Sequence, residues 1–517
     1  MSACEIQGWG VNDVYVGSLV LPLPDTDFRE FLDEVVRLAG AAPEIIKSID
    51  QDLDTHAREK KHLRLADKRF FESQTGDLPM MHIQEQNVLA GELNLAVGRP
   101  RMTAYAVYVF LMIRGFLGSL ISKPAKRFLH ESITLYAFLQ ERGLILPAMT
   151  TIQENVNEVS HATRELIFDR QLASVLGEKL DDFKSLTLDS THVKANSAWP
   201  TDGKILTELL MRVSRRGQAL HLFGLENLLP RGVPRWLEAM GKREFQICLA
   251  AGKPKSKGKM KKHYRQLLRL GRKTAEVLSA ELNRLALADA LKKLPPSQRV
   301  LLQRLVEQMK SDLSDAYRVI EYASNRVFDD QVLPSTQKML SLSDGSAAYI
   351  QKGGRDAVIG YKPQLVRSEN GFITSMRVPQ GNTADSSELV PAIADCIRRT
   401  GVVPEWVSTD DGYASAKGRA EVLGLGVKDI SISGAKGKKL TQEDAWASEP
   451  YRAARRNRSA VESLMFTIKD GFEFGQLGRR GQEAVRDELL EKVLAYNVCR
   501  IVLMKKRRRE APLAQVA

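Results

Sequence analysis

Apolar residues recur at helical spacing through most of the first 180 positions. Between Phe28 and Leu38 they stand three or four positions apart, and the same spacing returns from Thr103 to about Leu176. This pattern predicts an all-helical N-terminal region, in which residues 1–100 carry no chemical motif. The predicted helices beyond that point cover 103–122, 124–142 and a segment that opens at 150.

Short helices joined by tight turns, as in residues 101–180, are compatible with a helix-turn-helix that enters the major groove of DNA. Any small helical bundle gives the same pattern. The segment is therefore either a DNA-binding unit, which is our working prediction, or a plain helical core.

The first strand pattern appears at 185–193. Alternation puts Leu186 and Leu188 on one face and Asp189 on the other. A carboxylate inside so β-prone a segment is costly unless something pairs with it. Asp189 is therefore either an edge-strand residue that faces water or part of a polar site.

Strand and helix patterns alternate again from residue 357. Asn370-Gly371 between two alternating segments predicts a β-hairpin. Asp410 ends a later strand before Asp411 and Gly412, where turn chemistry accounts for one of the two aspartates. The predicted elements are strands at 357–366, 372–378, 405–410 and 427–433, helices at 385–399 and 415–423, a basic loop at 436–439 and the helix that carries Glu462.

This order of elements is that of an α/β RNase H-like domain with a mixed five-stranded sheet. In that fold the carboxylates of the first strand, the fourth strand and a late helix converge, which selects Asp189, Asp410 and Glu462. Three oxygen ligands of this kind suit Mg²⁺ or Mn²⁺. Two such ions can activate a water or a 3′-hydroxyl for in-line attack on a phosphodiester.

The spacing of the three acids agrees with this fold. Fifty-two positions separate Asp410 from Glu462, which is room for a helix, a strand and a loop only. From Asp189 to Asp410 there are 221 positions, although the intervening elements need roughly 80. The excess predicts a large helical insertion. The predicted segments are 1–100 and 101–180 (helical), 181–200 with 341–482 (catalytic), 201–340 (helical basic insertion) and 483–517 (C-terminal helix and basic tail).

The front of this insertion, residues 253–273, holds ten Lys and Arg residues and no acid. A solvated loop between helices is the usual meaning of such a charge run, and contact with the DNA backbone is the alternative. We predict DNA contact. The residues expected to make it are Lys255, Lys257, Lys259, Lys261, Lys262 and Arg265.

A second basic feature surrounds the third acid. At about 3.6 residues per turn, Arg458, Glu462 and Lys469 lie on one stripe of a helix. Arg458 and Glu462 alone form an ordinary i,i+4 ion pair. A carboxylate between two cations is also an arrangement suited to a metal ion and a phosphate group.

Composition narrows the class of partner. The 517 residues carry a net charge of +13 with a pI near 9.4, which favours a polyanion such as DNA. Four scattered cysteines exclude a zinc cluster or a disulfide framework and favour a reducing cytoplasm. The chain opens without a secretory signal, and its longest apolar segment is too short to cross a bilayer.

Four motifs between Thr103 and Gly481 resemble those of the DDE transposases of bacterial insertion sequences. They are Leu188-Asp-Ser-Thr191 with Lys194-Ala-Asn and the segment Trp199 to Leu206, Gly360-Tyr-Lys362 with Gly381 to Ser386, Ser408-Thr-Asp-Asp-Gly-Tyr413, and Arg458-x3-Glu462-x6-Lys469 followed by Phe474 to Gly481. Two features depart from some relatives. Arg455 stands where they have a Tyr, and the insertion precedes the second aspartate instead of the glutamate.

The resemblance implies a transposase that binds the terminal inverted repeats of an insertion sequence, cleaves these ends and joins the 3′-hydroxyls to target DNA. Asp189, Asp410 and Glu462 would hold two divalent ions, and Arg458 and Lys469 would contact phosphates. The implied partners are double-stranded DNA and further copies of the chain, in a homodimer or larger synaptic complex. The implied setting is the cytoplasm, at the nucleoid.

Two other classes share most of these features. A metal-dependent DNA nuclease of the same fold has the three acids but joins no strands. A DNA-binding repressor derived from a transposase binds the ends and leaves them intact, and the presence of all three acids argues against it.

Overall fold

The structure is a computed structural model that describes residues 28–75, 101–120, 122–196, 201–226, 229–251, 253–331, 338–351 and 357–514. The chain divides into two compact units, the first within 1–55, 99–196 and 346–517 and the second within 56–98 and 197–345. Parts of the predicted N-terminal region (1–27 and 76–100) and Trp199 and Pro200 of the first motif lie outside the described residues.

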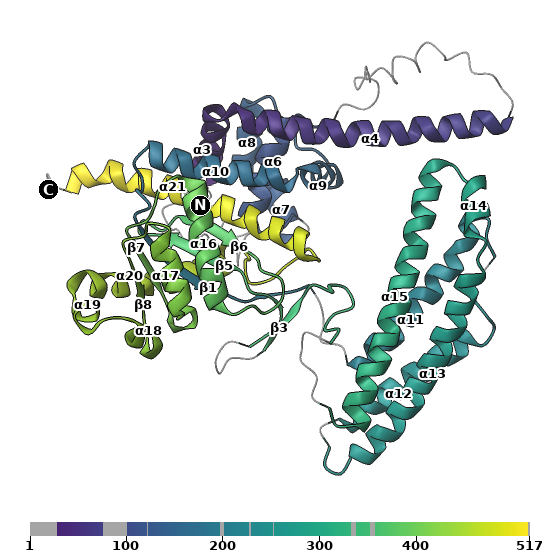
Figure 1. Cartoon of the computed structure of the whole chain (residues 1–517). Helices are drawn as coiled ribbons and strands as arrows, with labels where there is room; N and C mark the ends of the chain where they lie inside the picture. Colours follow the sequence, from purple (N-terminus) through teal and green to yellow (C-terminus); the bar gives the residue numbers. More distant parts are fainter. Residues whose placement is uncertain are drawn as a thin grey trace, which may run out of the picture. The chain divides into compact units, whose positions relative to one another are not determined.

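The first unit is built on a five-stranded sheet (Figure 1). β1 lies at its centre, antiparallel to β5 and parallel to β7, so the sheet is mixed. This topology is compatible with an RNase H-like α/β domain. The strands, in order across the sheet, are β6 (Ile373–Arg377), β5 (Gln364–Ser368), β1 (Ser185–Ser190), β7 (Trp406–Thr409) and β8 (Asp429–Ile432).

Pro363 divides the strand that the sequence predicts over 357–366. Proline lacks a backbone N–H and cannot continue a ladder in the middle of a sheet. The prediction of one long strand was therefore wrong, because its first half belongs to a separate three-stranded sheet. That sheet consists of β2 (Val193–Lys194), β4 (Val358–Tyr361) and β3 (Ala348–Ile350).

Different helices cover the two faces of the five-stranded sheet. Leu186 and Leu188 of β1 belong to an apolar core with α16 (Asp385–Thr400) and α17 (Ala416–Gly424). On the opposite face, α20 (Glu449–Gly471) packs against β1, β7 and β8. Both leucines therefore point to one face, as the alternation along β1 predicts.

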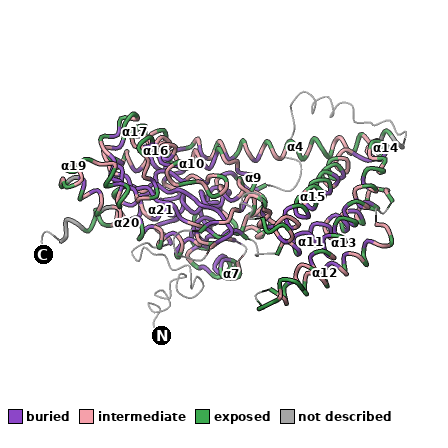
Figure 2. The backbone as a smooth tube through the Cα atoms, turned by 60° about the horizontal axis from the view of Figure 1, so that its bottom comes forward, coloured by how far each residue is buried: buried purple, intermediate pink, exposed green. Residues whose placement is uncertain are grey.

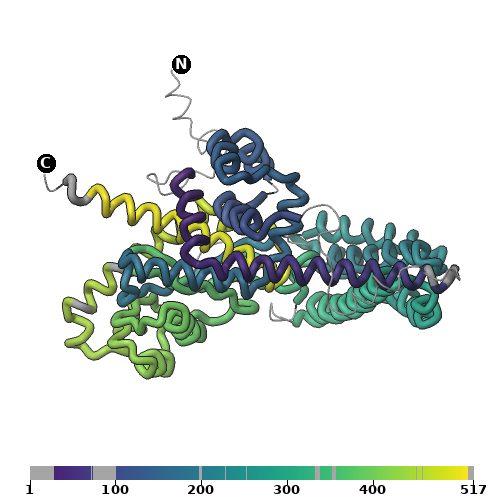
Figure 3. Tube along the Cα trace, turned by 90° about the horizontal axis from the view of Figure 1, so that it is seen from above, coloured from purple at the N-terminus to yellow at the C-terminus, as the bar shows by residue number. Residues whose placement is uncertain are grey.

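Three of the N-terminal helices, α3, α6 and α10, pack against the C-terminal helix α21 (Gln482–Ala514), whose middle is buried (Figure 2). In Figure 3 this yellow helix runs beside the blue helices, and α6 and α10 have the most extensive contacts with it. The described N-terminal helices are α3 (Phe28–Ala41), α4 (Pro43–Thr75), α6 (Ala104–Phe116), α7 (Lys123–Glu131), α8 (Ile133–Glu141), α9 (Met149–Glu158) and α10 (His161–Gly177).

Ser132 splits the helix predicted over 124–142 into α7 and α8. Its backbone is extended, and its side chain accepts the N–H of Leu135 at 3.1 Å as the N-cap of α8. The apolar spacing continues through both helices, so periodicity alone did not reveal the break.

A buried cluster of charges ties α21 to this helical layer. The Glu491 carboxylate lies 2.7 Å from Arg114 of α6, 2.8 Å from Arg164 of α10 and 2.9 Å from Arg479. Burial alone raises the pKa of Glu491, but the three arginines outweigh it and hold the pKa well below its ordinary value. Burial lowers the pKa of Arg114 to about 10, so this side chain stays charged at neutral pH. Each charge is therefore compensated in a site where an unpaired one is very costly.

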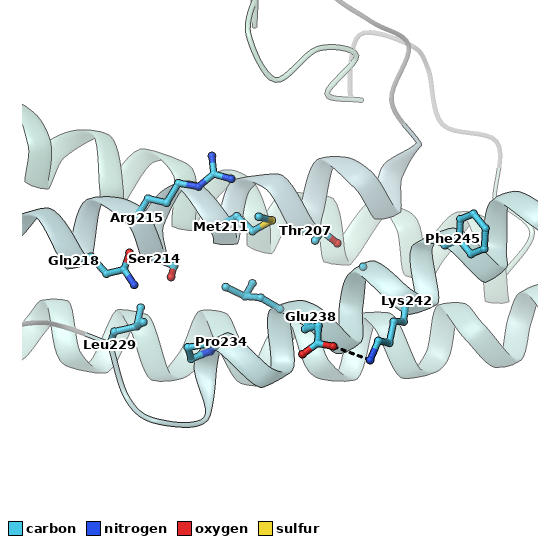
Figure 4. A pocket seen from close by; sticks show the side chains of 12 residues that line it. Thr207, Met211, Ser214, Arg215, Gln218, Leu229, Pro234, Glu238, Lys242 and Phe245 are labelled. Carbon is cyan, nitrogen blue, oxygen red and sulfur yellow. Dashed lines mark ion pairs between the residues drawn. The ribbon is translucent and has the colours of Figure 1, made fainter.

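The second unit is a helical bundle with its own apolar core. It includes a cavity of about 670 Å³ between α11 and α12, lined by Met211, Leu229, Phe245 and the ion pair of Glu238 with Lys242 (Figure 4). Its main helices are α11 (Asp202–Ala219), α12 (Val233–Ala250), α13 (Lys257–Arg284), α14 (Leu287–Lys293) and α15 (Pro296–Phe328). In the described part of the chain, no helix is long and apolar enough to span a membrane.

The contact of α6 with α21 generates a prediction about stability. A Cβ on Gly115 would come 2.2 Å from the backbone oxygen of Glu491, so Gly115→Ala forces the two helices apart. We expect the free energy of unfolding to fall by about 1–3 kcal/mol in urea denaturation. Gly40→Ala is the matched control, because a Cβ there meets nothing within 4 Å and improves helix propensity. Equal destabilisation of both variants would contradict the close packing.

Candidate catalytic site

Asp189 and Asp410 lie beside each other at the ends of two parallel strands. Thr187 of β1 pairs with Ser408 of β7, so extending this register by two residues brings Asp189 next to Asp410. Neighbouring strands are about 4.8 Å apart. Because alternation repeats every second residue, both aspartates point to the face that α20 covers.

Local hydrogen bonds distinguish Asp410 from Asp411. The N–H of Gly412 donates to Asp410 Oδ1 at 2.9 Å, which fixes that side chain at the strand end. Asp411 instead accepts the N–H groups of Lys436 and Gly437, at 3.0 and 2.8 Å, at the start of α18 (Ala435–Leu440). The predicted basic loop at 436–439 was therefore wrong, because this segment is a short helix capped by Asp411.

Sequence reasoning missed a third carboxylate near the two aspartates. Burial raises the pKa of the Tyr413 hydroxyl well above 10, and the carboxylates of Asp385, Asp189 and Asp410 raise it further. Asp385 opens α16 and pairs with Lys362, whose Nζ lies 2.8 Å from its Oδ1. The available signal was Asp385 in the motif after Gly381, which we used only as a helix start.

Glu462 lies on the helix that packs over the two aspartates. Ser408 Oγ donates to the backbone oxygen of Ala454 at 2.8 Å, which joins β7 to α20. Val461 is fully buried, whereas the side chain of Glu462 is 71 % exposed. Glu462 therefore stands at the edge of the packed face of α20.

The predicted cations near Glu462 differ in their surroundings. Arg458 Nη2 lies 3.8 Å from Glu462 Oε1, a loose ion pair, and the buried Nε of Arg458 has no hydrogen-bond partner. Lys469 lines a cavity of about 550 Å³ together with Lys194 and Gln476. Arg455 is occupied elsewhere, because its guanidinium stacks 4.2 Å from the centre of the Trp446 ring.

Within the described ranges, no three His, Cys, Asp or Glu side chains lie together as a ready metal-holding group. The structure brings Asp189 and Asp410 together by register and leaves the Glu462 side chain directed to solvent. Neighbouring carboxylates repel one another.

Residues 324–498 match the family model described as Transposase DDE domain. The chain contains a transposase DDE domain. The match covers Asp410 and Glu462, and Asp189 precedes it. No curated protein and no solved structure matches the chain. The family implies DNA as the substrate, and its members typically use divalent metal ions.

The basic segment, residues 253–273, is largely exposed in the second unit. Lys257 and Lys261 lie 3.1 and 3.8 Å from Asp330, and the Arg265 guanidinium lies 5.5 Å from the centre of the Phe328 ring. Among the described residues, no acid forms an ion pair with Lys255, Lys259 or Lys262. The six predicted residues are therefore not equivalent.

The two neighbouring aspartates are expected to affect stability in opposite directions. Asp411→Asn keeps one acceptor for the N–H groups at the start of α18 but removes the negative charge there, which should lower the free energy of unfolding by about 0.3–1 kcal/mol. Asp410→Asn keeps an acceptor for Gly412 and removes a charge near Asp189 and Asp385, so its free energy of unfolding should be unchanged or higher. Urea denaturation in the presence of a chelator measures both.

The same pair gives a dependence on pH. Burial raises the pKa of Asp411 and the N–H groups of Gly437 and Lys436 lower it more, so its net pKa in the folded protein is depressed. The contribution of Asp411 to the free energy of unfolding is therefore complete above the pKa that this carboxyl has in the unfolded chain. It is lost as the pH falls through the pKa of the folded protein. The difference in free energy of unfolding between Asp411→Asn and the unsubstituted protein should therefore shrink in acid. A difference that stays constant with pH would refute the capping role.

Proposed function

We propose that this protein is a DNA transposase that binds the terminal inverted repeats of an insertion sequence, cleaves these ends and joins the 3′-hydroxyls to target DNA. The observation that supports it best is the adjacency of Asp189 and Asp410 at parallel strand ends, under the helix that carries Glu462. The match to transposase DDE domains supports the same function.

The donor chemistry of these residues fits two Mg²⁺ or Mn²⁺ ions. Asp189 and Asp410 offer adjacent carboxylate oxygens, which hard divalent cations prefer. Glu462 is the third donor, and its exposed side chain has rotamer freedom to turn toward them. Bound ions of this kind supply activation of the attacking oxygen and stabilisation of the leaving oxygen.

Arg458 and Lys469 are proposed to hold phosphates beside the scissile bond. The unpartnered Nε of Arg458 is a buried donor that a phosphate oxygen would satisfy. A guanidinium also keeps its charge at every pH at which the protein works. Lys469 would add a second positive charge two helical turns after Glu462.

We propose that residues 101–180 bind the element ends, that the basic segment contacts the DNA backbone, and that two or more copies act together in the cytoplasm at the nucleoid. A plain metal-dependent nuclease is the second candidate, since it needs the same acids. Incubation with a target plasmid separates them, because only the transposase yields products joined through the 3′-hydroxyl.

Glu462→Gln is expected to abolish cleavage of a duplex that carries the terminal repeats flanking the gene, with end binding nearly unchanged. The control is Glu449→Gln, since that residue starts the same helix, is 67 % exposed and also pairs with an arginine. Gel analysis of cleavage and of binding measures both variants. Retained cleavage by Glu462→Gln would remove this residue from the site.

The basic segment should contribute through counterion release. Changing Lys255, Lys259 and Lys262 to Gln should reduce the dependence of log affinity on log salt by about 0.9 for each phosphate that is no longer neutralised. Lys257→Gln and Lys261→Gln should do less, because Asp330 already pairs with both. DNA affinity measured between low and physiological salt tests this, and equal slopes for all variants would exclude backbone contact.

A further inference from the structure

We propose that Asp385 is a positioning residue that holds the ends of β1 and β7 so that Asp189 and Asp410 stay aligned for metal binding. This inference rests on the proposed function. It assigns to the Asp385 carboxylate a role that it exercises through the residues beside the two aspartates.

Asp385 is the centre of a buried polar network. Its side chain is 13 % exposed, and its Oδ1 accepts from Gln364 Nε2 at 2.9 Å and lies 2.8 Å from Lys362 Nζ. Gln364 is fully buried in β5, the neighbour of β1. Burial opposes ionisation of Asp385, but these hydrogen bonds outweigh it and lower its pKa.

The network reaches the strand ends on both sides. Ser190, which follows Asp189, hydrogen-bonds to Asp385 through its side chain. The hydroxyl of Tyr413, three residues after Asp410, donates to Gln364 Oε1. Because Tyr413 is buried, bulk water does not compete for this hydrogen bond. One carboxylate therefore links the residue after Asp189 to the segment after Asp410.

Gly412 brings Asp385 still closer to Asp410. A Cβ at this position would lie 3.0 Å from Asp410 Oδ1 and 3.2 Å from Asp385 Oδ2. The glycine whose N–H fixes Asp410 thus lies between the two carboxylates. Lys362 balances the charge of Asp385, so the positioning network adds little to the repulsion between the aspartates.

The same helix supplies a matched control. Asp395 of α16 is 12 % exposed and lies 2.8 Å from Arg399 Nε. Its other contacts are Ser375 and Arg398, which belong to elements that hold none of the three candidate acids. Removal of the Asp395 carboxylate should therefore cost stability without disturbing the aspartates.

The test measures Mn²⁺ binding to the full chain by electron paramagnetic resonance, without DNA. Asp385→Ala should weaken Mn²⁺ binding about tenfold, as is typical when a residue that orients metal ligands is removed. Asp385→Asn, which can still accept from Gln364, should weaken it less. Asp395→Ala should leave the affinity unchanged, and urea denaturation of all three shows whether their stabilities are comparable.

Equal Mn²⁺ affinity in Asp385→Ala, Asp385→Asn and the unsubstituted protein would overturn the positioning role. So would an equal decrease in Asp395→Ala, because the effect would then follow general stability. If Asp385→Ala does not fold, the Mn²⁺ affinity of Asp385→Asn alone tests the positioning role. Failure of the unsubstituted protein to join element ends to a target plasmid would instead overturn the proposed function and leave the comparison of Mn²⁺ affinities valid.

Discussion

The parallel pairing of β1 with β7 is the constraint on which the rest of the first unit depends. It sets Asp189 beside Asp410 although 221 positions separate them in the chain. A slip of one residue would turn one aspartate to the opposite face, into the apolar core with α16. Burial of Leu186 and Leu188 in that core therefore fixes the geometry of the acids on the other face.

Gathered carboxylates are costly, and the surrounding residues offset the cost in different ways. Asp411 caps α18, and Lys362 neutralises Asp385. Glu462 remains in solvent, where its charge is hydrated. Elsewhere in the unit, Glu491 shows the opposite solution, in which three arginines surround one fully buried carboxylate. Arginines thus neutralise Glu491, whereas the oxygens of Asp189, Asp410 and Glu462 suit a divalent cation.

Local pattern predicted the alternation along β1, the helix that ends at Gly401 and a strand over 405–410, of which the structure has Trp406–Thr409, because burial of one face leaves a periodic trace in the sequence. It failed at Pro363 and Ser132, where a single residue ends an element inside an unbroken apolar pattern. It also failed for Asp385, because the partners of this residue come from strands and turns distant in the chain. The roles of the three predicted acids and of the basic segment stay predictions.

The small sheet of β2, β4 and β3 joins the chain just before and just after the helices α11 to α15. Val193 and Gly360 approach so closely that a Cβ on Gly360 would come 1.8 Å from the Val193 backbone oxygen. Once the two ends of an inserted segment are held together, doubling its length adds only about 0.6 kcal/mol of loop-closure entropy. A change in the length of the segment from α11 to α15 therefore costs little loop-closure entropy and leaves the register of β1 with β7 unchanged.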